Sequence, residues 1–153
     1  MSCHIKKLNH LIFGCYSVVK VFSGEMIVPL KKNGPVILLT DFGTHDAYAG
    51  ILRGVIAGIN PEARVIDLTH GIEPQNIRQG AFILYCAYVW YPENSIFCTV
   101  VDPGVGSDRK AICIKTRDYF FVGPDNGVFW EAASANGIEQ IIQLENPDFF
   151  LSC

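Results

Sequence analysis

Acidic side chains directly follow three apolar segments of this chain. Asp41 comes after the run VILLT, Asp102 comes after SIFCTVV, and Asp125 comes after FFVGP. Glycines stand within a few residues of each one, and a glycine lets the backbone approach a ligand closely. Polar groups next to buried strands are costly unless they are hydrogen bonded or used. The three segments are therefore candidate parts of one binding or catalytic site.

Each of these residues also has a purely structural interpretation. Asp41 is compatible with an Asx turn, Asp102 with a turn that begins at Pro103, and Asp125 with a turn and helix cap. Arg109, in the segment after Asp102, fits a solvated loop equally well. For Asp41 and Asp102 we favour a functional role, whereas for Asp125 and Arg109 the two interpretations are balanced.

The histidines give a weaker signal. We favour a structural role for His70, which follows Thr69, and a capping role for His45 and Asp46 at a helix start. Four scattered histidines and the absence of a C-x-x-C pair provide no metal constellation. We therefore expect no metal site and no cofactor.

The elements that must position these residues alternate along the chain. Apolar runs without polar alternation are typical of strands buried on both faces. We expect strands at 36–40, 64–68, 95–101, 111–116, 119–122 and 139–144, and helices at 46–59, 76–91 and 126–136. This order predicts an α/β fold with a mostly parallel sheet and helices on both faces, in three layers. Because ligands bind beyond the carboxyl ends of parallel strands, Asp41 and Asp102 should share one rim.

Local signals refine two helices. Asn76 is a candidate cap with Gln79 three residues on, in capping-box position. Gly50, Gly54 and Gly58 are spaced four apart, and we expect this row to let the first helix lie close against the sheet.

Composition excludes several classes of protein. The 153 residues include 12 Lys+Arg and 15 Asp+Glu, and 50% are hydrophobic. A net charge of −3 gives no electrostatic footprint for nucleic acid, and the apolar runs are too short for a membrane span. The six cysteines form no C-x-x-C, which favours a reducing cytoplasm over a disulfide scaffold. Cys86, Cys98 and Cys113 lie in apolar segments, as small buried hydrophobes do.

We expect two regions. Residues 1–34 should be an extension ahead of the domain, and disordered; a weak secretory signal is the alternative, since a basic HIKKLNH precedes an apolar stretch. Residues 35–153 should form the α/β domain. Common site motifs are absent: Arg109 breaks a dinucleotide fingerprint, and there is no P-loop and no G-x-S-x-G elbow.

Four segments together resemble one family. LTDFGTHDAYAGILRGVI, INPEARVIDLTHGIEPQNIRQGA, VVDPGVGSDRKAI and FVGPDNGVF are similar, in this order, to the S-adenosylmethionine hydroxide adenosyltransferases. These are S-adenosylmethionine hydrolases related to fluorinating and chlorinating enzymes. The resemblance covers about residues 35–150.

The resemblance implies a reaction and three roles. Water or hydroxide attacks the ribose C5′ of S-adenosylmethionine, and adenosine and L-methionine leave. Asp41 matches the aspartate that holds the ribose hydroxyls, and a carboxylate can accept from both hydroxyls of a diol. Asp102 and Arg109 match two members of a group that positions and activates the water, with Arg109 keeping Asp102 ionised. The resemblance also implies a homotrimer with S-adenosylmethionine as a substrate rather than a cofactor.

Two departures leave alternatives open. The fluorinating enzyme carries Tyr where Asp102 stands and Thr where Val105 stands, and a carboxylate there would repel a halide, so a halogenase is the less favoured alternative. The resemblance places the family's catalytic histidine, in an H-G-R-D segment, shortly after Phe150 and its C-terminal β domain beyond that, whereas the sequence stops at Cys153. A catalytically dead nucleoside-binding or assembly module is therefore also an alternative.

Overall fold

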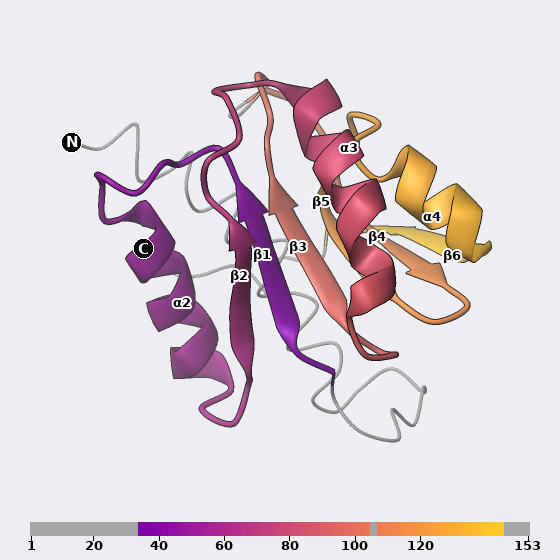
Figure 1. Ribbon diagram of the computed structural model, residues 1–153, viewed down its shortest axis with the longest axis horizontal. Coiled ribbons are helices and arrows are strands. Elements are labelled where there is room, and N and C mark those ends of the chain that lie inside the picture. The colour runs from indigo at the N-terminus through magenta and orange to yellow at the C-terminus, as the bar shows by residue number, and fades with distance from the viewer. Residues whose placement is uncertain (1–33, 105–106, 146–153) are drawn as a thin grey trace.

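The computed structural model describes residues 34–104 and 107–145 (Figure 1). The expectations for residues 1–33, for Val105 and for residues beyond 145 lie outside this part of the chain. The strands are β1 (Val36–Thr40), β2 (Val65–Thr69), β3 (Ile96–Val100), β4 (Ala111–Thr116), β5 (Phe120–Pro124) and β6 (Ile138–Gln143). The helices are α2 (Tyr48–Ile59), α3 (Ile77–Ala87), the short 3₁₀ helix η1 (Tyr88–Trp90) and α4 (Trp130–Asn136).

The strands form one mixed sheet in the order β2-β1-β3-β5-β4-β6. β1 pairs parallel with both β2 and β3, and β3 pairs parallel with β5. β4 runs antiparallel to both of its neighbours, β5 and β6. The short turn between β4 and β5 explains the change, because a tight hairpin reverses the chain whereas the helical crossovers do not. The expected mostly parallel α/β sheet is confirmed.

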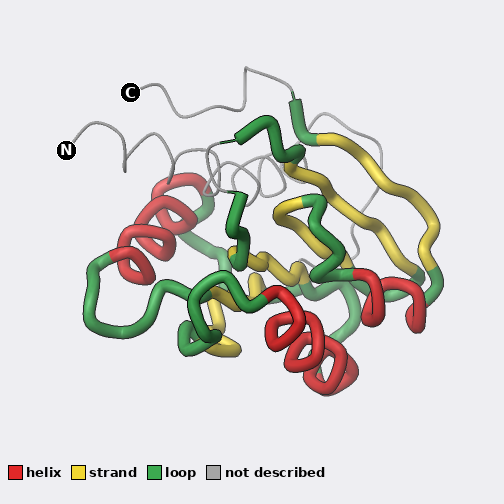
Figure 2. Tube along the Cα trace, turned by 90° about the horizontal axis from the view of Figure 1, so that it is seen from above, coloured by secondary structure: helices red, strands yellow, loops and turns green. Residues whose placement is uncertain are grey.

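Helices cover both faces of the sheet. α2 packs on one face, where Leu52 and Ile56 contact a core that includes Leu38 and Cys98. α3 and α4 pack on the other face, as Figures 1 and 2 show. β1 serves both layers, because alternate residues of a strand point to opposite faces and all five of its residues are buried. The three-layer arrangement predicted from sequence is confirmed.

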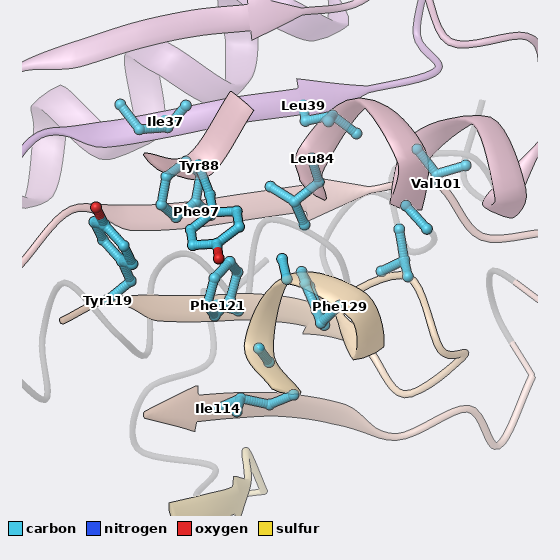
Figure 3. Close-up of a cluster of buried hydrophobic side chains, with 14 of the residues drawn as sticks. Ile37, Leu39, Leu84, Tyr88, Phe97, Val101, Ile114, Tyr119, Phe121 and Phe129 are labelled. Atoms are coloured by element: carbon cyan, nitrogen blue, oxygen red, sulfur yellow. The ribbon is translucent and has the colours of Figure 1, made fainter. Parts of the chain in front are cut away.

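The larger core lies under α3 and α4 and is rich in aromatic rings (Figure 3). Phe97 of β3 and Phe121 of β5 stack with ring centroids 5.3 Å apart. Tyr119 meets Phe97 edge to face at 5.6 Å, and its hydroxyl donates to the Tyr91 carbonyl at 3.1 Å. This core fixes β3 and β5 side by side, and the segments that carry Asp102 and Asp125 follow these two strands.

The prediction for the glycine row of α2 is wrong. Gly50, Gly54 and Gly58 face outward, and a Cβ placed on any of them would meet nothing within 4 Å. Leu52 and Ile56 occupy the sheet-facing side instead, with 0% exposure. A helix turns about 100° per residue, so the glycine row lies on the side opposite to these two residues.

The predicted cap of α2 is also wrong. The helix begins at Tyr48 after Ala47, no side chain caps it, and its first turn holds no acidic residue. His45 and Asp46 lie exposed in the preceding loop.

The cap predicted for α3 is confirmed, since the Asn76 side chain accepts from the Gln79 N–H at 3.0 Å. The Gln79 side chain accepts from the Glu73 N–H at 2.7 Å, not from Asn76 as a capping box would have it. The α-helix stops at Ala87 and tightens into η1 rather than running to Tyr91.

Two further expectations concern α4 and the cysteines. α4 starts at Trp130, later than predicted, and Gly137 follows its end with φ of 83°. Cys98 and Cys113 are buried as expected, but Cys86 is exposed. Cys98 is disulfide-bonded, which the preference for reduced cysteines did not predict, whereas Cys113 is free. Within the described residues, no helix is long and apolar enough to cross a membrane.

Candidate active site at the carboxyl rim of the sheet

The loops that carry the candidate residues leave the sheet at the same rim. Thr40 and Val100 are partners in the parallel register of β1 and β3, and the Asp41 N–H donates to the Val100 carbonyl at 3.2 Å. Asp102 follows two residues after Val100. β5 runs parallel to β3, so Asp125 emerges at this rim as well. The structure thus brings together the three loops that the sequence singled out.

Asp102 is a buried carboxylate with two partners. Its side chain is 4% exposed, and its Oδ1 accepts from the Gly104 N–H at 2.9 Å. The Arg109 Nε lies 3.4 Å from the same oxygen. Burial of a carboxylate is unfavourable unless it is paired or hydrogen bonded. These contacts provide both forms of compensation and fix the direction in which Asp102 points.

Arg109 joins two loops. Besides Asp102, its guanidinium contacts the Asp125 carbonyl, to which Nη1 donates at 3.2 Å. Ser107 braces the same turn, because its hydroxyl donates to the Gly104 carbonyl at 2.6 Å and accepts from the Arg109 N–H at 3.3 Å. The interpretation of Arg109 as a merely solvated loop residue does not fit these contacts.

Asp125 contributes its main chain to this arrangement. Its side chain is exposed, whereas its N–H donates to the Lys110 carbonyl at 2.9 Å. The neighbouring Asn126 donates from Nδ2 to the Val101 carbonyl at 2.9 Å and accepts the Val128 N–H at 3.1 Å. The structural interpretation of this segment, as a turn that orders the rim, therefore accounts for what is seen.

Asp41 is tied to the segment that precedes α3. Its Oδ2 accepts from the Gln75 N–H at 2.7 Å, and Gln75 has a φ of 66°. A carboxylate offers about four lone-pair positions, so one N–H leaves capacity for hydroxyl groups of a ligand. Asp41 is half-buried at the rim. Sequence reasoning missed Gln75, because a backbone N–H leaves no trace in the residue type.

His70 lies beside the loop that carries Asp41 and holds this loop through hydrogen bonds. The Thr40 hydroxyl lies 2.7 Å from the His70 Nδ1, and the Gly43 N–H donates to the His70 carbonyl at 2.7 Å. The Phe42 N–H donates to the Thr40 hydroxyl at 3.3 Å. His70 is 7% exposed. A structural role for His70, favoured from the sequence, agrees with this burial and hydrogen bonding.

The second ring nitrogen of His70 faces a charged pair. Nε2 lies 3.2 Å from the Asp67 Oδ1, but the contact is not aligned well enough for a hydrogen bond. Asp67 is itself paired with Arg53 of α2. Burial, followed by the positive charge of Arg53, lowers the pKa of His70 from its usual 6.5. The imidazole is therefore neutral near neutral pH.

The described residues contain no group of three or more His, Cys, Asp or Glu side chains that would hold a metal ion. The chemistry available at the rim is that of an ionisable carboxylate held by a guanidinium, with a second carboxylate on the adjoining loop. Such a pair can orient a water molecule and accept hydrogen bonds from a polyol.

Comparison with known proteins assigns the chain to a family. Residues 36–152 match the model of the SAM hydroxide adenosyltransferase N-terminal domain. The chain is 44% identical over 119 residues to an (R)-S-adenosyl-L-methionine hydrolase of Methanocaldococcus jannaschii, covering 74% of this chain and 45% of that protein. It is 39% identical over 113 residues to the enzyme of that name from Thermus thermophilus, covering 74% and 44%. A fluorinase of Actinopolyspora mzabensis is 20% identical over 138 residues, covering 74% and 46%.

A solved structure agrees. An uncharacterised conserved protein from Thermotoga maritima superposes with a TM-score of 0.72 at 44% identity, over 74% of this chain and 44% of that one. The chain spans less than half the length of the curated relatives that it matches. The fold, the ordered motifs and these matches lead to one conclusion: the chain belongs to the SAM hydroxide adenosyltransferase N-terminal domain family.

Proposed function

We propose that this chain provides the active-site loops, at the carboxyl edge of the sheet, of an adenosine-forming S-adenosyl-L-methionine hydrolase. In this site Asp102 and Arg109 act on water, and Asp41 holds the ribose. One observation carries the proposal. Asp102 is buried at the rim and held by both the Gly104 N–H and the Arg109 guanidinium. The names of the relatives that are about 40% identical support the substrate.

The reaction needs little beyond an aligned nucleophile. A water oxygen forms a bond to C5′ of the ribose while the bond from C5′ to the sulfonium sulfur breaks, and the electron pair leaves with methionine. The water proton passes to a carboxylate or to solvent, and adenosine results. A sulfonium is a good leaving group, so neither a general acid nor a metal is required. Alignment in a site that excludes bulk water supplies the rate enhancement.

The three side chains divide this task. Asp102 accepts a hydrogen bond from the water and so orients it toward C5′. Arg109 fixes the direction of the Asp102 carboxylate through a charge-assisted contact. Asp41 accepts from the ribose hydroxyls on the neighbouring loop. The Asp41–Gln75 contact holds that carboxylate in place.

A carboxylate at the nucleophile position favours water over halide. An ionised Asp102 repels an approaching anion, and the guanidinium that could attract one is already engaged with Asp102 and the Asp125 carbonyl. Halide transfer is therefore the disfavoured reaction.

Product analysis tests the proposal. The protein is incubated with S-adenosyl-L-methionine, with and without chloride or fluoride, and products are separated by chromatography. We expect adenosine in both samples. A 5′-halo-5′-deoxyadenosine product would replace the proposal with the halogenase. Saturable adenosine binding without any adenosine release would replace it with a nucleoside-binding module.

The homotrimer and the cytoplasmic location stay predictions. Sedimentation of the purified chain measures the first, and imaging of the tagged protein in its host cell measures the second.

A further inference from the structure

We propose that His70 is a positioning residue for Asp41: its neutral imidazole accepts the Thr40 hydroxyl and thereby sets the loop from which Asp41 reaches the ribose. The inference rests on the proposed ribose-binding role of Asp41 and extends it to a residue that lies behind the site. His70 itself is not expected to touch the substrate.

The contacts around the Asp41 loop converge on His70. Its ring approaches the Thr40 hydroxyl at 2.7 Å, and its carbonyl accepts the Gly43 N–H at 2.7 Å. These two contacts bracket Asp41 from both sides along the chain. The Asp41 N–H, in turn, is held by the Val100 carbonyl. The loop is thus fixed at the residues immediately around Asp41.

The hydrogen-bond inventory assigns the direction of the Thr40–His70 bond. The Thr40 hydroxyl already accepts the Phe42 N–H, and Thr40 is 0% exposed. Within the described part of the chain, the His70 Nδ1 is the acceptor that its proton reaches. A buried hydroxyl without an acceptor is costly, so Nδ1 is unprotonated and Nε2 carries the hydrogen.

The charge beyond the ring agrees with this tautomer. A protonated Nε2 places its hydrogen near the Asp67 Oδ1, 3.2 Å from the nitrogen although not aligned as a hydrogen bond, whereas an unprotonated Nε2 would place a lone pair near a carboxylate. Arg53 of α2 pairs with Asp67 and holds it in position. A series of contacts therefore runs from Arg53 of α2 through Asp67 and His70 to Thr40, and we call this series the brace.

The brace and the ribose-binding group lie on different sides of the loop. The Asp41 carboxylate contacts Gln75, just before α3, whereas the Thr40 hydroxyl faces His70 and, beyond it, α2. Because Thr40 and Asp41 are adjacent, a rotation of the Thr40 backbone swings the carboxylate. Two hydrogen bonds from a vicinal diol tolerate little such movement, since their geometry is directional.

Two substitutions separate the two ring nitrogens. In His70→Asn the side-chain oxygen stands two bonds from Cβ, as Nδ1 does, and can accept the Thr40 hydroxyl. In His70→Gln the amide nitrogen stands three bonds from Cβ, as Nε2 does, so the contact to Asp67 is retained and the contact to Thr40 is lost. Binding of adenosine and of 2′,3′-dideoxyadenosine, which lacks both hydroxyls that Asp41 is proposed to hold, is measured by calorimetry for both variants and for the wild type.

The expected signature is a loss of sugar discrimination. His70→Gln should weaken adenosine binding roughly tenfold, the scale of one lost hydrogen bond, and leave 2′,3′-dideoxyadenosine binding nearly unchanged. His70→Asn should bind both as the wild type does. Equal weakening of both ligands in His70→Gln would overturn the proposal, because a general structural defect does not depend on the ribose hydroxyls.

A ligand-free measurement keeps this inference distinct from the proposed function. The Gln75 amide donates to Asp41, so its hydrogen-exchange rate reports where the carboxylate lies. We expect faster exchange in His70→Gln and wild-type exchange in His70→Asn. If the wild type binds no adenosine, the proposed function fails while this comparison still decides the positioning role. Unchanged Gln75 exchange in His70→Gln would overturn that role.

Discussion

The guanidinium of Arg109 joins Asp102 to the loop after β5: its Nε lies 3.4 Å from the Asp102 Oδ1, and its Nη1 donates to the Asp125 carbonyl. One side chain thereby sets the distance between two loops that follow adjacent parallel strands. The carboxylate that we assign to the water is therefore held by the same group that holds the rim together.

Removing the charge of Asp102 should remove activity while keeping the fold. In Asp102→Asn the amide oxygen can still accept the Gly104 N–H, so the melting temperature should change little. The amide is a poor proton acceptor, and we expect adenosine release to fall by ~100-fold or more. The rate is measured by chromatography of adenosine, alongside the melting curve. Activity near that of the wild type would exclude Asp102 from the mechanism.

Arg109 should matter for its shape as well as its charge. Arg109→Lys keeps a cation but cannot contact Asp102 and the Asp125 carbonyl with one planar fork. We expect adenosine release to fall roughly tenfold in Arg109→Lys and further in Arg109→Gln. Because the Arg109 side chain is 36% exposed, the free energy of unfolding should drop by only about 1 kcal/mol or less.

The fold-change in adenosine release can be converted to a change in activation free energy. If the free energy of unfolding of Arg109→Lys and Arg109→Gln falls by more than that amount, Arg109 serves the fold rather than the reaction.

Gly123 is the position in β5 that tolerates no side chain. A Cβ there would overlap the Thr99 carbonyl oxygen of β3 and lie 3.0 Å from Phe129. Gly123→Ala should therefore lower the free energy of unfolding by about 3 kcal/mol. Gly127→Ala is the matched control, since its φ of 89° is also positive but a Cβ there meets nothing within 4 Å.

For that control the conformational cost alone applies, about 1 kcal/mol. Chemical denaturation measures both values, and equal losses would show that the contact with β3 is not the cause at Gly123.

His70 should make stability depend on pH. Burial and the charge of Arg53 lower the pKa of His70 from 6.5, while Asp67 faces its Nε2. The unfolded chain then binds the proton more readily than the folded protein, so stability due to His70 is full above about pH 6.5 and is lost as pH falls through the lowered pKa. In chemical denaturation, the free energy of unfolding of the wild type should fall relative to that of His70→Asn as the pH is lowered from about 7.5 to about 5. A constant difference between the two would contradict the neutral, buried imidazole.

The sequence predicts which residues gather at the carboxyl edge of the sheet. It does not predict the tertiary contacts that hold these residues in place. Uninterrupted apolar runs identify β1 and β3, and the rule that ligands gather at the carboxyl ends of parallel strands then places Asp41 and Asp102 together. The contact of Asp41 with the Gln75 N–H and that of Thr40 with His70 escape such reasoning. Both join segments about 30 residues apart through the tertiary fold, and neither follows from a local pattern.

The orientation of α2 shows a different limit. Ile51, Leu52, Val55 and Ile56 spread apolar groups over much of the helix surface, so periodicity does not decide which side meets the sheet. The structure buries Leu52 and Ile56 and leaves Ile51 44% exposed. The glycine row, which the sequence analysis predicts to pack against the sheet, is exposed to solvent, because branched side chains bury more apolar area than glycine does.

The outward glycines offer a stability gain. Gly54→Ala should raise the free energy of unfolding by about 0.5–1 kcal/mol, because alanine has the higher helix propensity and its Cβ would meet nothing within 4 Å. Gly58→Ala, on the same side of α2, should behave in the same way. Denaturant unfolding measures both, and a loss at either position would mean that another surface covers this side of α2.

The uncapped start and the exposed glycines make α2 the part of the fold expected to undergo sub-global opening first. Arg53 leaves with it, and the Asp67 carboxylate then loses its counter-charge beside the imidazole. Opening of α2 should thereby be coupled to the position of Asp41, and so to the ribose contact that we propose for it.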